Sequence, residues 1–305
     1  MFIDYLISFI LALIMFTIGS TLKPVNFVYL AKNPKLVTIG LLLQMLFLPI
    51  MAFILVSWFP MRDEFKVGIM VLALCPGGTT ANLVSFLVNA EVALSIALTS
   101  INSFLILATI PLFTYLTLIF FTGHGDIIHL PVGDTIINIL VIILLPVAVG
   151  MLFNRFFPKW SLFIKNPLKY LTIVMLALMF LIKFFAPNSQ GGSGITGRDI
   201  LILLPVTLLI HVLSVILSYY LSRMSITSIR SCTTIAIEVG LQNTTLALLI
   251  TSTLLKNEEM AKPALVYALF SFFTTFGFAW WVMKRNRKRI EQYESQTDPS
   301  ERPDR

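Results

Sequence analysis

The pattern of apolar residues along the chain predicts a bundle of helices that cross a membrane. A membrane-spanning helix needs about 20 consecutive apolar residues, and segments of this kind recur along almost the whole chain. Short polar connectors separate them. We expect nine spans, at residues 3–22, 35–59, 66–88, 92–121, 134–154, 167–186, 199–221, 228–254 and 263–284.

The composition agrees with an all-α, polytopic membrane protein. Of the 305 residues, 57% are hydrophobic and 12% are charged, whereas soluble domains carry about 25% charged residues. The net charge of +7 would suit nucleic-acid binding only if the basic residues formed one face of a soluble domain, but they lie in the connectors and the tail. We therefore expect a lipid bilayer around the protein and no nucleic-acid partner.

Basic residues alternate from one connector to the next, which predicts the orientation of the chain. Cytoplasmic loops of membrane proteins collect Lys and Arg. The even-numbered connectors are balanced or poor in charge. The basic positions are Lys23, Lys32, Lys35, Arg155, Lys159, Lys165, Lys169, Arg223, Arg230, Lys284, Arg285, Arg287, Lys288 and Arg289. This alternation places the N-terminus outside and the C-terminus in the cytoplasm, in a cell inner membrane or plasma membrane.

Two of the spans are interrupted near their middle. In the third span, Pro76 precedes two glycines; proline removes a helix hydrogen bond, and glycine lets the backbone open. In the eighth span, Gly240 marks a second interruption. Placing Asn82 on Asn243 gives an offset of 161 residues, which also pairs the fourth span with the ninth and the first with the sixth.

The paired interruptions predict an inverted repeat, because an odd number of helices separates the start points in each pair. We expect a first repeat of four helices at residues 1–122, a second of five at 133–284, and a disordered cytoplasmic tail at 285–305. Paired breaks in two inverted halves indicate a transporter's binding site. The alternative is that Pro-Gly-Gly is only a kink and the offset is chance, since Gly and Pro are common in membrane helices.

Glu238 lies in an otherwise apolar stretch beside the second break. A carboxylate at the bilayer centre costs about 2.5–3.5 kcal/mol on insertion scales, so a cation, a proton or a basic partner must offset that cost. In the fourth span, Ser95, Thr99 and Asn102 share one helix face by their spacing. Ser and Thr in membranes commonly bond a neighbouring helix. Beside Asn82, the same face instead suits a hard cation such as Na⁺, which prefers oxygen ligands.

Several other polar residues in the spans have a structural interpretation. We expect Cys75 and Cys232 to be buried thiols rather than a disulfide. His211 has no carboxylate at helical spacing and is expected to pack against a neighbour. Lys183 lies near a span end and is expected to snorkel toward the surface. Gln44 either bonds an adjacent helix or helps to bind a second cation.

Three segments in combination resemble the bile acid:sodium symporter family, namely Cys75-Pro-Gly-Gly-Thr-Thr-Ala-Asn82, Glu91-Val-Ala-Leu-Ser95-Ile-Ala-Leu-Thr99-Ser100 and Glu238-Val-Gly-Leu-Gln242-Asn243. The resemblance extends over residues 10–285. It implies inverted repeats, two discontinuous helices that cross, and a core domain against which a panel domain moves.

The resemblance also implies two Na⁺ sites behind the crossing. One would be formed by Asn82, Ser95, Thr99 and Glu238. The other would be formed by Gln44, Glu238, Gln242 and the backbone carbonyls of Val239 and Leu241. The substrate would lie near Thr79, Thr80 and Asn243.

The chain departs from the family pattern at three places. Its first repeat has one helix fewer than the usual five. Ala81 stands where members often have Ser, which removes one oxygen near the first ion site. Some members carry a His in the last helix, where this chain has Phe272-Phe-Thr274-Thr275.

These features favour a secondary active transporter rather than an enzyme. We expect Na⁺-coupled uptake of an organic anion, bile acid-like or a small carboxylate such as pantoate, by alternating access. The half-helix after Gly78 would present free N–H groups to the anion. The alternative is a proton-driven exporter of related fold, of the arsenite or auxin type, in which Cys75 could bind arsenite. An intramembrane enzyme with Glu238 as base and His211 as its partner is disfavoured.

Overall fold

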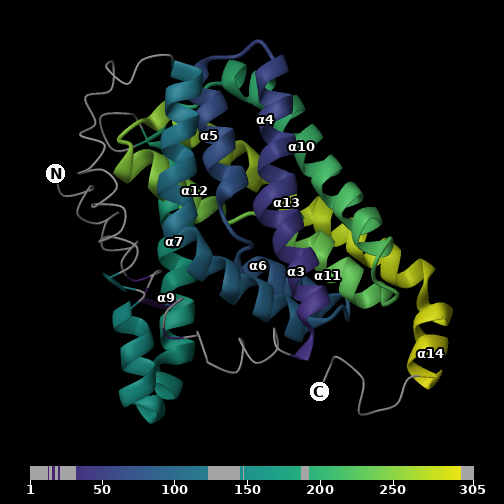
Figure 1. The fold of residues 1–305 in the computed structure, drawn as a ribbon. Helices are drawn as coiled ribbons and strands as arrows, with labels where there is room; N and C mark the ends of the chain where they lie inside the picture. The colour runs from purple at the N-terminus through teal and green to yellow at the C-terminus, as the bar shows by residue number, and fades with distance from the viewer. Residues whose placement is uncertain are drawn as a thin grey trace.

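The computed structural model describes residues 32–122, 145–146, 148–186 and 192–296, together with positions 13, 16, 17 and 20. These residues form helices and no strand (Figure 1). In chain order the helices are α3 (Pro34–Leu42), η1 (Leu43–Phe47), α4 (Leu48–Trp58), α5 (Asp63–Leu74), α6 (Thr79–Leu87), α7 (Val92–Thr122), α9 (Pro158–Phe185), α10 (Gly197–Arg223), α11 (Ile229–Gly240), α12 (Thr244–Leu249), η3 (Ile250–Leu254), α13 (Glu258–Arg285) and α14 (Arg287–Gln296).

The helices agree with the all-α membrane architecture expected from the sequence. Three continuous segments among the described residues are long and apolar enough to cross a membrane: Pro34–Trp58, Gly197–Arg223 and Glu258–Arg285. α7 adds a fourth if its two halves, which bend by 61°, form one span. Pro111 lies just after this bend and explains it. Proline has no N–H to donate to the carbonyl four residues earlier, so the helix kinks there. The predicted spans 3–22 and 134–154 lie mostly outside the described residues, so the total of nine stays a prediction.

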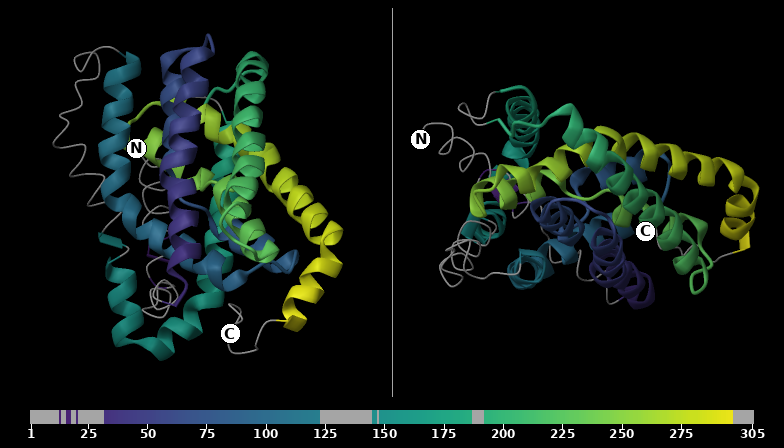
Figure 2. Two further views of the ribbon diagram at one scale, coloured as in Figure 1. Left: turned by 45° about the vertical axis from the view of Figure 1, so that its right-hand side comes forward. Right: turned by 90° about the horizontal axis from the view of Figure 1, so that it is seen from above.

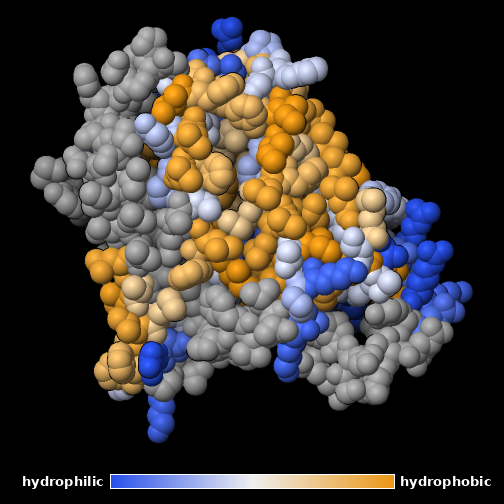
Figure 3. All heavy atoms as spheres, in the orientation of Figure 1, coloured by the Kyte–Doolittle hydropathy of each residue, from blue (hydrophilic) through white to orange (hydrophobic). Residues whose placement is uncertain are grey.

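The surface also suits a lipid environment. Apolar side chains cover the middle of the face seen in Figure 3, while hydrophilic side chains gather at its upper and lower ends. Leu201 on α10 is 75% exposed and Phe273 on α13 is 72% exposed. Continuous exposed apolar surface of this kind favours lipid contact over water.

The two interrupted helices form the centre of the protein. In α11 every residue from Ser231 to Gly240 is buried, and in α5 every residue from Val67 to Leu74 is buried. A helix that is buried on all sides belongs to the interior of a bundle. α10 and α13 run side by side along this centre, as both views in Figure 2 show.

An ion-pair cluster joins the N-terminal ends of α5, α10 and α13. Arg62 and Lys262 each approach both Asp199 and Glu259, at distances of 2.5–3.2 Å between nitrogen and oxygen. The three connectors that carry these residues therefore lie on one face of the molecule, as the alternation of loop charge requires. The side of the membrane on which this face lies stays a prediction.

The orientation can be tested at the two ends of α10. Arg198 and Ser225 are exposed near its first and last turns. We expect an Arg198→Cys variant to react with a membrane-impermeant maleimide added to intact cells, and a Ser225→Cys variant to react only after the membrane is opened. The native Cys75 and Cys232 are buried and should contribute little background. Reaction of both variants from the same side would contradict a single crossing by α10.

Lys183 does not snorkel as expected. Its side chain is 1% exposed, and its Nζ lies 2.5 Å from Oε1 of Glu258 at the start of α13. The backbone N–H of Ser193 donates to the Lys183 carbonyl at 2.9 Å and so holds the segment before α10 against the end of α9. A buried ammonium is stable when a carboxylate compensates its charge, and this partner lies 75 residues away in the sequence.

The prediction of a disordered tail at residues 285–305 covers too many residues. α13 continues to Arg285, and α14 occupies Arg287–Gln296. The segment is rich in Arg, Lys, Glu and Gln, which are good helix formers. A pair at i and i+4, with Arg287 Nε 2.9 Å from Glu291 Oε1, supports the helix. Residues 297–305 lie outside the described part of the chain.

Candidate functional site

The two helix breaks lie side by side and bond to each other. The Gly78 N–H donates to the Leu241 carbonyl at 3.2 Å, and the Asn243 N–H donates to the Pro76 carbonyl at 2.9 Å. Together these bonds form a short antiparallel bridge. Backbone groups that leave a helix inside a membrane must find partners, so each break satisfies part of the other.

Local chemistry explains where each break begins and ends. α5 stops at Leu74 because Pro76 forces the preceding Cys75 into an extended conformation, with ψ of 151°. α11 stops at Gly240. α12 begins after Asn243, whose side-chain carbonyl accepts from the Leu246 N–H at 3.0 Å and caps the helix.

Glu238 points into the space beside these breaks and is fully buried. The Ser95 hydroxyl lies 2.5 Å from its Oε1, and the Thr99 hydroxyl lies 3.0 Å from each carboxylate oxygen. The Asn82 side-chain carbonyl lies 2.8 Å from the same Ser95 hydroxyl. The structure therefore brings together Asn82 from α6, Ser95 and Thr99 from α7, and Glu238 from α11.

This cluster contains more hydrogen-bond acceptors than donors. The two carboxylate oxygens and the Asn82 carbonyl only accept, while Ser95 and Thr99 supply one hydrogen each. Ser85 adds one more hydroxyl, 3.4 Å from the Ser95 oxygen. A group of mainly neutral oxygens around one carboxylate has the chemistry of a site for a hard cation.

Gly77 allows the carboxylate to approach the first break. A Cβ built on this glycine would lie 2.1 Å from Oε2 of Glu238. That separation is far below van der Waals contact, so no side chain fits here while the carboxylate keeps its place.

A second polar group surrounds the last turn of α11. The Gln44 side-chain amide donates to the Glu238 carbonyl at 3.1 Å, and the Gln242 amide donates to the Val239 carbonyl at 2.6 Å. The Oε1 atoms of both glutamines are buried and have no hydrogen-bond partner among the described residues. Unsatisfied buried acceptors cost free energy, so both oxygens are suited to a cation.

Gln44 reaches this position from a local widening of its helix. η1 is one turn of π-helix, in which the Leu48 N–H bonds to the Leu43 carbonyl five residues earlier. Pro49 follows directly and lacks the N–H that a regular α-helix would use. Widened turns of this kind are frequent at functional sites.

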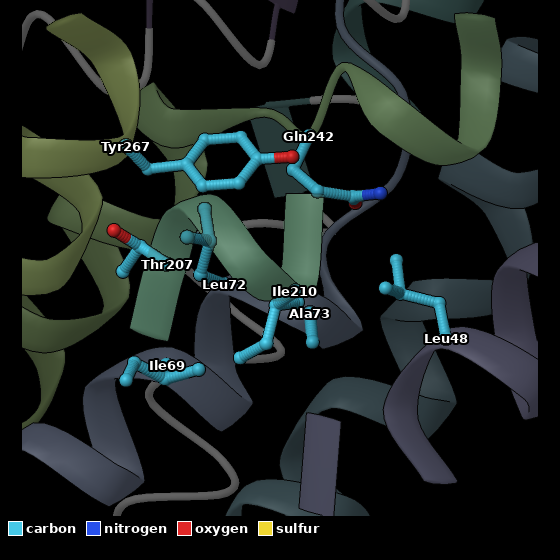
Figure 4. Close-up of a pocket in the computed structure, with 8 residues that line it drawn as sticks. All are labelled: Leu48, Ile69, Leu72, Ala73, Thr207, Ile210, Gln242 and Tyr267. Atoms are coloured by element: carbon cyan, nitrogen blue, oxygen red, sulfur yellow. The ribbon is translucent and has the colours of Figure 1, made fainter. Parts of the chain in front are cut away.

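A small cavity lies against Gln242 (Figure 4). The Tyr267 hydroxyl points toward the Gln242 side chain in this view. Apart from these two residues and Thr207, the lining is apolar: Leu48, Ile69, Leu72, Ala73 and Ile210. The volume of the cavity is about 10 Å³, which is close to the volume that one water molecule needs.

The residues expected near the substrate lie around Gly78. A Cβ built on Gly78 would lie 3.3 Å from the Thr80 hydroxyl and 3.8 Å from the Asn243 Cα. Thr80 is exposed and Asn243 is half-buried. The capping bond to Leu246 already uses the Asn243 carbonyl oxygen, which leaves its amide N–H groups for a ligand. Of Thr79 the structure describes the backbone, at the first position of α6.

Sequence reasoning missed one buried carboxylate. Glu91 is buried and accepts a hydrogen bond from Ser231, while its backbone N–H donates to the Thr234 hydroxyl at 2.8 Å. It ties the start of α7 to α11, and its place at the edge of an apolar span was the only available signal. Asn102 shares the face of Ser95 by spacing and its buried Oδ1 has no hydrogen-bond partner among the described residues, so its part in an ion site stays a prediction.

Comparison with known proteins identifies the family. The model of the Sodium Bile acid symporter family matches residues 8–192, which is more than half of the chain. The chain belongs to this family. The resemblance to this family found in the sequence is thereby confirmed.

Individual relatives cover most of the chain. The sodium-dependent transporter YocS of Bacillus subtilis is 29% identical over 239 residues, which is 78% of this chain and 70% of that protein. The ileal sodium/bile acid cotransporter of Oryctolagus cuniculus is 28% identical over 271 residues, or 87% and 75%. The probable sodium/metabolite cotransporter BASS2 of Oryza sativa is 27% identical over 256 residues, or 84% and 58%. These names all describe transporters, in agreement with the prediction that this chain is not an enzyme.

Proposed function

We propose that this protein is a sodium-coupled secondary transporter that takes up an organic anion. The observation that carries the proposal is the cluster around Glu238, where a buried carboxylate meets neutral oxygens at the junction of two helix breaks. Helix breaks near the middle of a membrane are where transporters place their ion and substrate sites. A proton carrier needs the carboxylate alone, whereas a sodium site needs the oxygens around it.

Two Na⁺ ions would be cosubstrates. The first would bind Asn82, Ser95, Thr99 and Glu238, whose oxygens already converge. The second would bind Gln44, Glu238, Gln242 and the carbonyls of Val239 and Leu241. The two unpaired glutamine oxygens support this second site. Ala81 is buried and has no oxygen in its side chain, so the first site relies on the other four residues.

The anion would lie beside the N-terminus of α6, near Thr79, Thr80 and Asn243. The N-cap residue Gly78 has no side chain that could satisfy the first N–H groups of α6. Free N–H groups and the positive end of the helix dipole favour an anion. The names of the relatives include bile acids and metabolites, and we propose a bile acid-like anion or a small carboxylate such as pantoate as the substrate.

Transport would proceed by alternating access between two inverted repeats, at residues 1–122 and 133–284. The core domain would contain the two broken helices, and the panel domain would move against it. Sodium would fix the backbone on both sides of the breaks, and this would orient the N–H groups that meet the anion. We place the protein in a plasma or inner membrane, with its C-terminus in the cytoplasm.

The surroundings of Cys75 do not favour an arsenite site. Cys75 is buried in an apolar cluster with Val71 and Ile106. A thiol in such surroundings behaves as a small hydrophobic side chain.

Thr99→Val tests the coupling between ion and anion. The variant loses one oxygen of the first ion site and leaves Thr80 and Asn243 unchanged. Coupling between two ligands is reciprocal and typically changes affinity about 5- to 150-fold. We expect weaker binding of taurocholate or pantoate in NaCl and little change in KCl, as measured by calorimetry.

Thr117→Val is the matched control for this test. It is the same substitution on the same helix, and the Thr117 hydroxyl donates to the Phe113 carbonyl of that helix at 2.7 Å. Its anion affinity should equal that of the unmodified protein in both salts. Equal anion affinity of the unmodified protein in NaCl and KCl would refute sodium coupling.

A further inference from the structure

Four successive carbonyls at the end of α11 each accept a hydrogen bond from a different donor. The Glu238 and Val239 carbonyls accept from glutamine amides, and the Leu241 carbonyl accepts from the backbone of the first break. The Gly240 carbonyl accepts from the phenol of Tyr267, on α13. A tyrosine therefore fixes the one carbonyl that lies between the two proposed as sodium ligands.

The number of available hydrogens determines which atom donates in the contact between Tyr267 and His211. The Tyr267 phenol has one hydrogen, which it donates to Gly240. His211 Nδ1 lies 2.9 Å from the same phenol oxygen and must therefore donate to it. In the neutral imidazole Nε2 is then an acceptor; the Thr274 hydroxyl lies 2.7 Å from it and 2.9 Å from the Phe270 carbonyl. A chain of two hydrogen bonds thus runs from His211 on α10 to Tyr267 on α13 and on to Gly240, with Thr274 of α13 beside its first member.

The pair of rings is held rigidly. Tyr267 is 2% exposed and His211 is 1% exposed. Their rings meet edge to face, with 5.3 Å between centroids and an interplanar angle of 80°. Phe270 packs against both rings. α10 also presses directly on the break, because a Cβ built on Gly240 would lie 2.3 Å from a methyl carbon of Val215.

We propose that Tyr267 and His211 are positioning residues for the second sodium site. By binding the Gly240 carbonyl, Tyr267 holds it in place and sets the direction of its neighbours Val239 and Leu241. His211 fixes the phenol by donating to its oxygen, which leaves the phenol hydrogen for Gly240. The inference rests on the proposed sodium coupling and assigns to this pair a role in sodium affinity, without direct contact with the ion.

The test compares two tyrosine variants of the purified full-length chain. Tyr267→Phe removes the hydroxyl and keeps the ring. Tyr219→Phe is the matched control, since Tyr219 is a buried tyrosine of α10 that packs against Phe278. The probe is Na⁺ itself: the midpoint of thermal unfolding is titrated with NaCl, and KCl keeps the ionic strength constant.

We expect Tyr267→Phe to raise by about tenfold the Na⁺ concentration that gives a chosen rise of the unfolding midpoint, as for the loss of a hydrogen bond that orients a ligand. Well above the dissociation constant, the slope of the midpoint against the logarithm of Na⁺ concentration should stay close to that of the unmodified protein. Tyr219→Phe should leave both quantities unchanged. A purely structural role of Tyr267 would instead lower the unfolding midpoint equally in both salts.

Two variants of His211 provide an independent comparison if Tyr267→Phe does not fold. His211→Leu removes the donor to Tyr267, whereas His211→Asn keeps an N–H near the position of Nδ1. We expect His211→Leu to weaken Na⁺ binding and His211→Asn to restore most of it. Unchanged sodium affinity in Tyr267→Phe or His211→Leu, beside a clear response of the unmodified protein, would overturn this inference alone. No response of the unmodified protein to Na⁺ would overturn both this inference and the proposed function.

Discussion

Replacing Glu238 with Gln should abolish sodium-dependent uptake of the anion while the protein stays folded. Gln has nearly the same shape as Glu, and its amide can still bond the hydroxyls of Ser95 and Thr99. It lacks the negative charge that would compensate a buried cation. Removing one partner of a buried ion pair costs about 3–5 kcal/mol, which corresponds to at least about a hundredfold loss of Na⁺ affinity. Uptake into proteoliposomes under an inward Na⁺ gradient measures the effect.

Glu91→Gln is the control for the loss of a buried carboxylate. Glu91 is also buried on the helix that carries Ser95, but it bonds Ser231 at the other end of α11. This variant should keep its dependence on Na⁺, whatever its effect on stability. Full sodium-dependent uptake by Glu238→Gln would remove Glu238 from the ion site.

Replacing Gly77 with Ala should disable the first ion site through steric conflict alone. The new methyl group would lie 2.1 Å from the Glu238 carboxylate oxygen, so the carboxylate or the first break must shift. Overpacking of this kind typically costs about 1–3 kcal/mol. Because the movement falls on the proposed ligand, we expect it to appear as roughly a tenfold or larger loss of Na⁺ affinity.

Gly78→Ala separates this effect from a general need for glycine at the break. Its Cβ would meet the Thr80 hydroxyl at 3.3 Å and would lie farther from every other atom. A side-chain hydroxyl can move by a few tenths of an ångström, so this variant should keep most of its Na⁺ affinity. Equal affinities of the two variants in a sodium titration would show that Gly77 does not define the site.

The sequence predicted the parts of the site that depend on local rules. Pro76 and Gly240 mark breaks because proline and glycine act on their own backbone. Ser95 and Thr99 share a face because the period of the helix fixes it. A buried carboxylate is costly wherever it lies in a bilayer, so Glu238 could be identified without any partner in view.

The remaining features depend on contacts between helices far apart in the sequence. No pattern in the sequence predicts the contact of Lys183 with Glu258 or that of Tyr267 with Gly240, because the packing of α9, α11 and α13 decides these contacts. Periodicity places Asn102 on the face of Ser95, but what its buried Oδ1 contacts could not be read from the sequence. The repeat suggested that the two breaks lie close together. It could not predict which backbone groups of the two breaks form hydrogen bonds with each other.

The most direct test of sodium binding at the helix breaks is the thermal unfolding of the unmodified protein in NaCl and in KCl at equal ionic strength. A ligand that binds only the folded state stabilises it by about 2.7 kcal/mol at one hundred times its dissociation constant. Sodium binding at the breaks predicts that the unfolding midpoint rises with the logarithm of the NaCl concentration above the dissociation constant, and stays constant in KCl. The same midpoint in both salts at every concentration would contradict it.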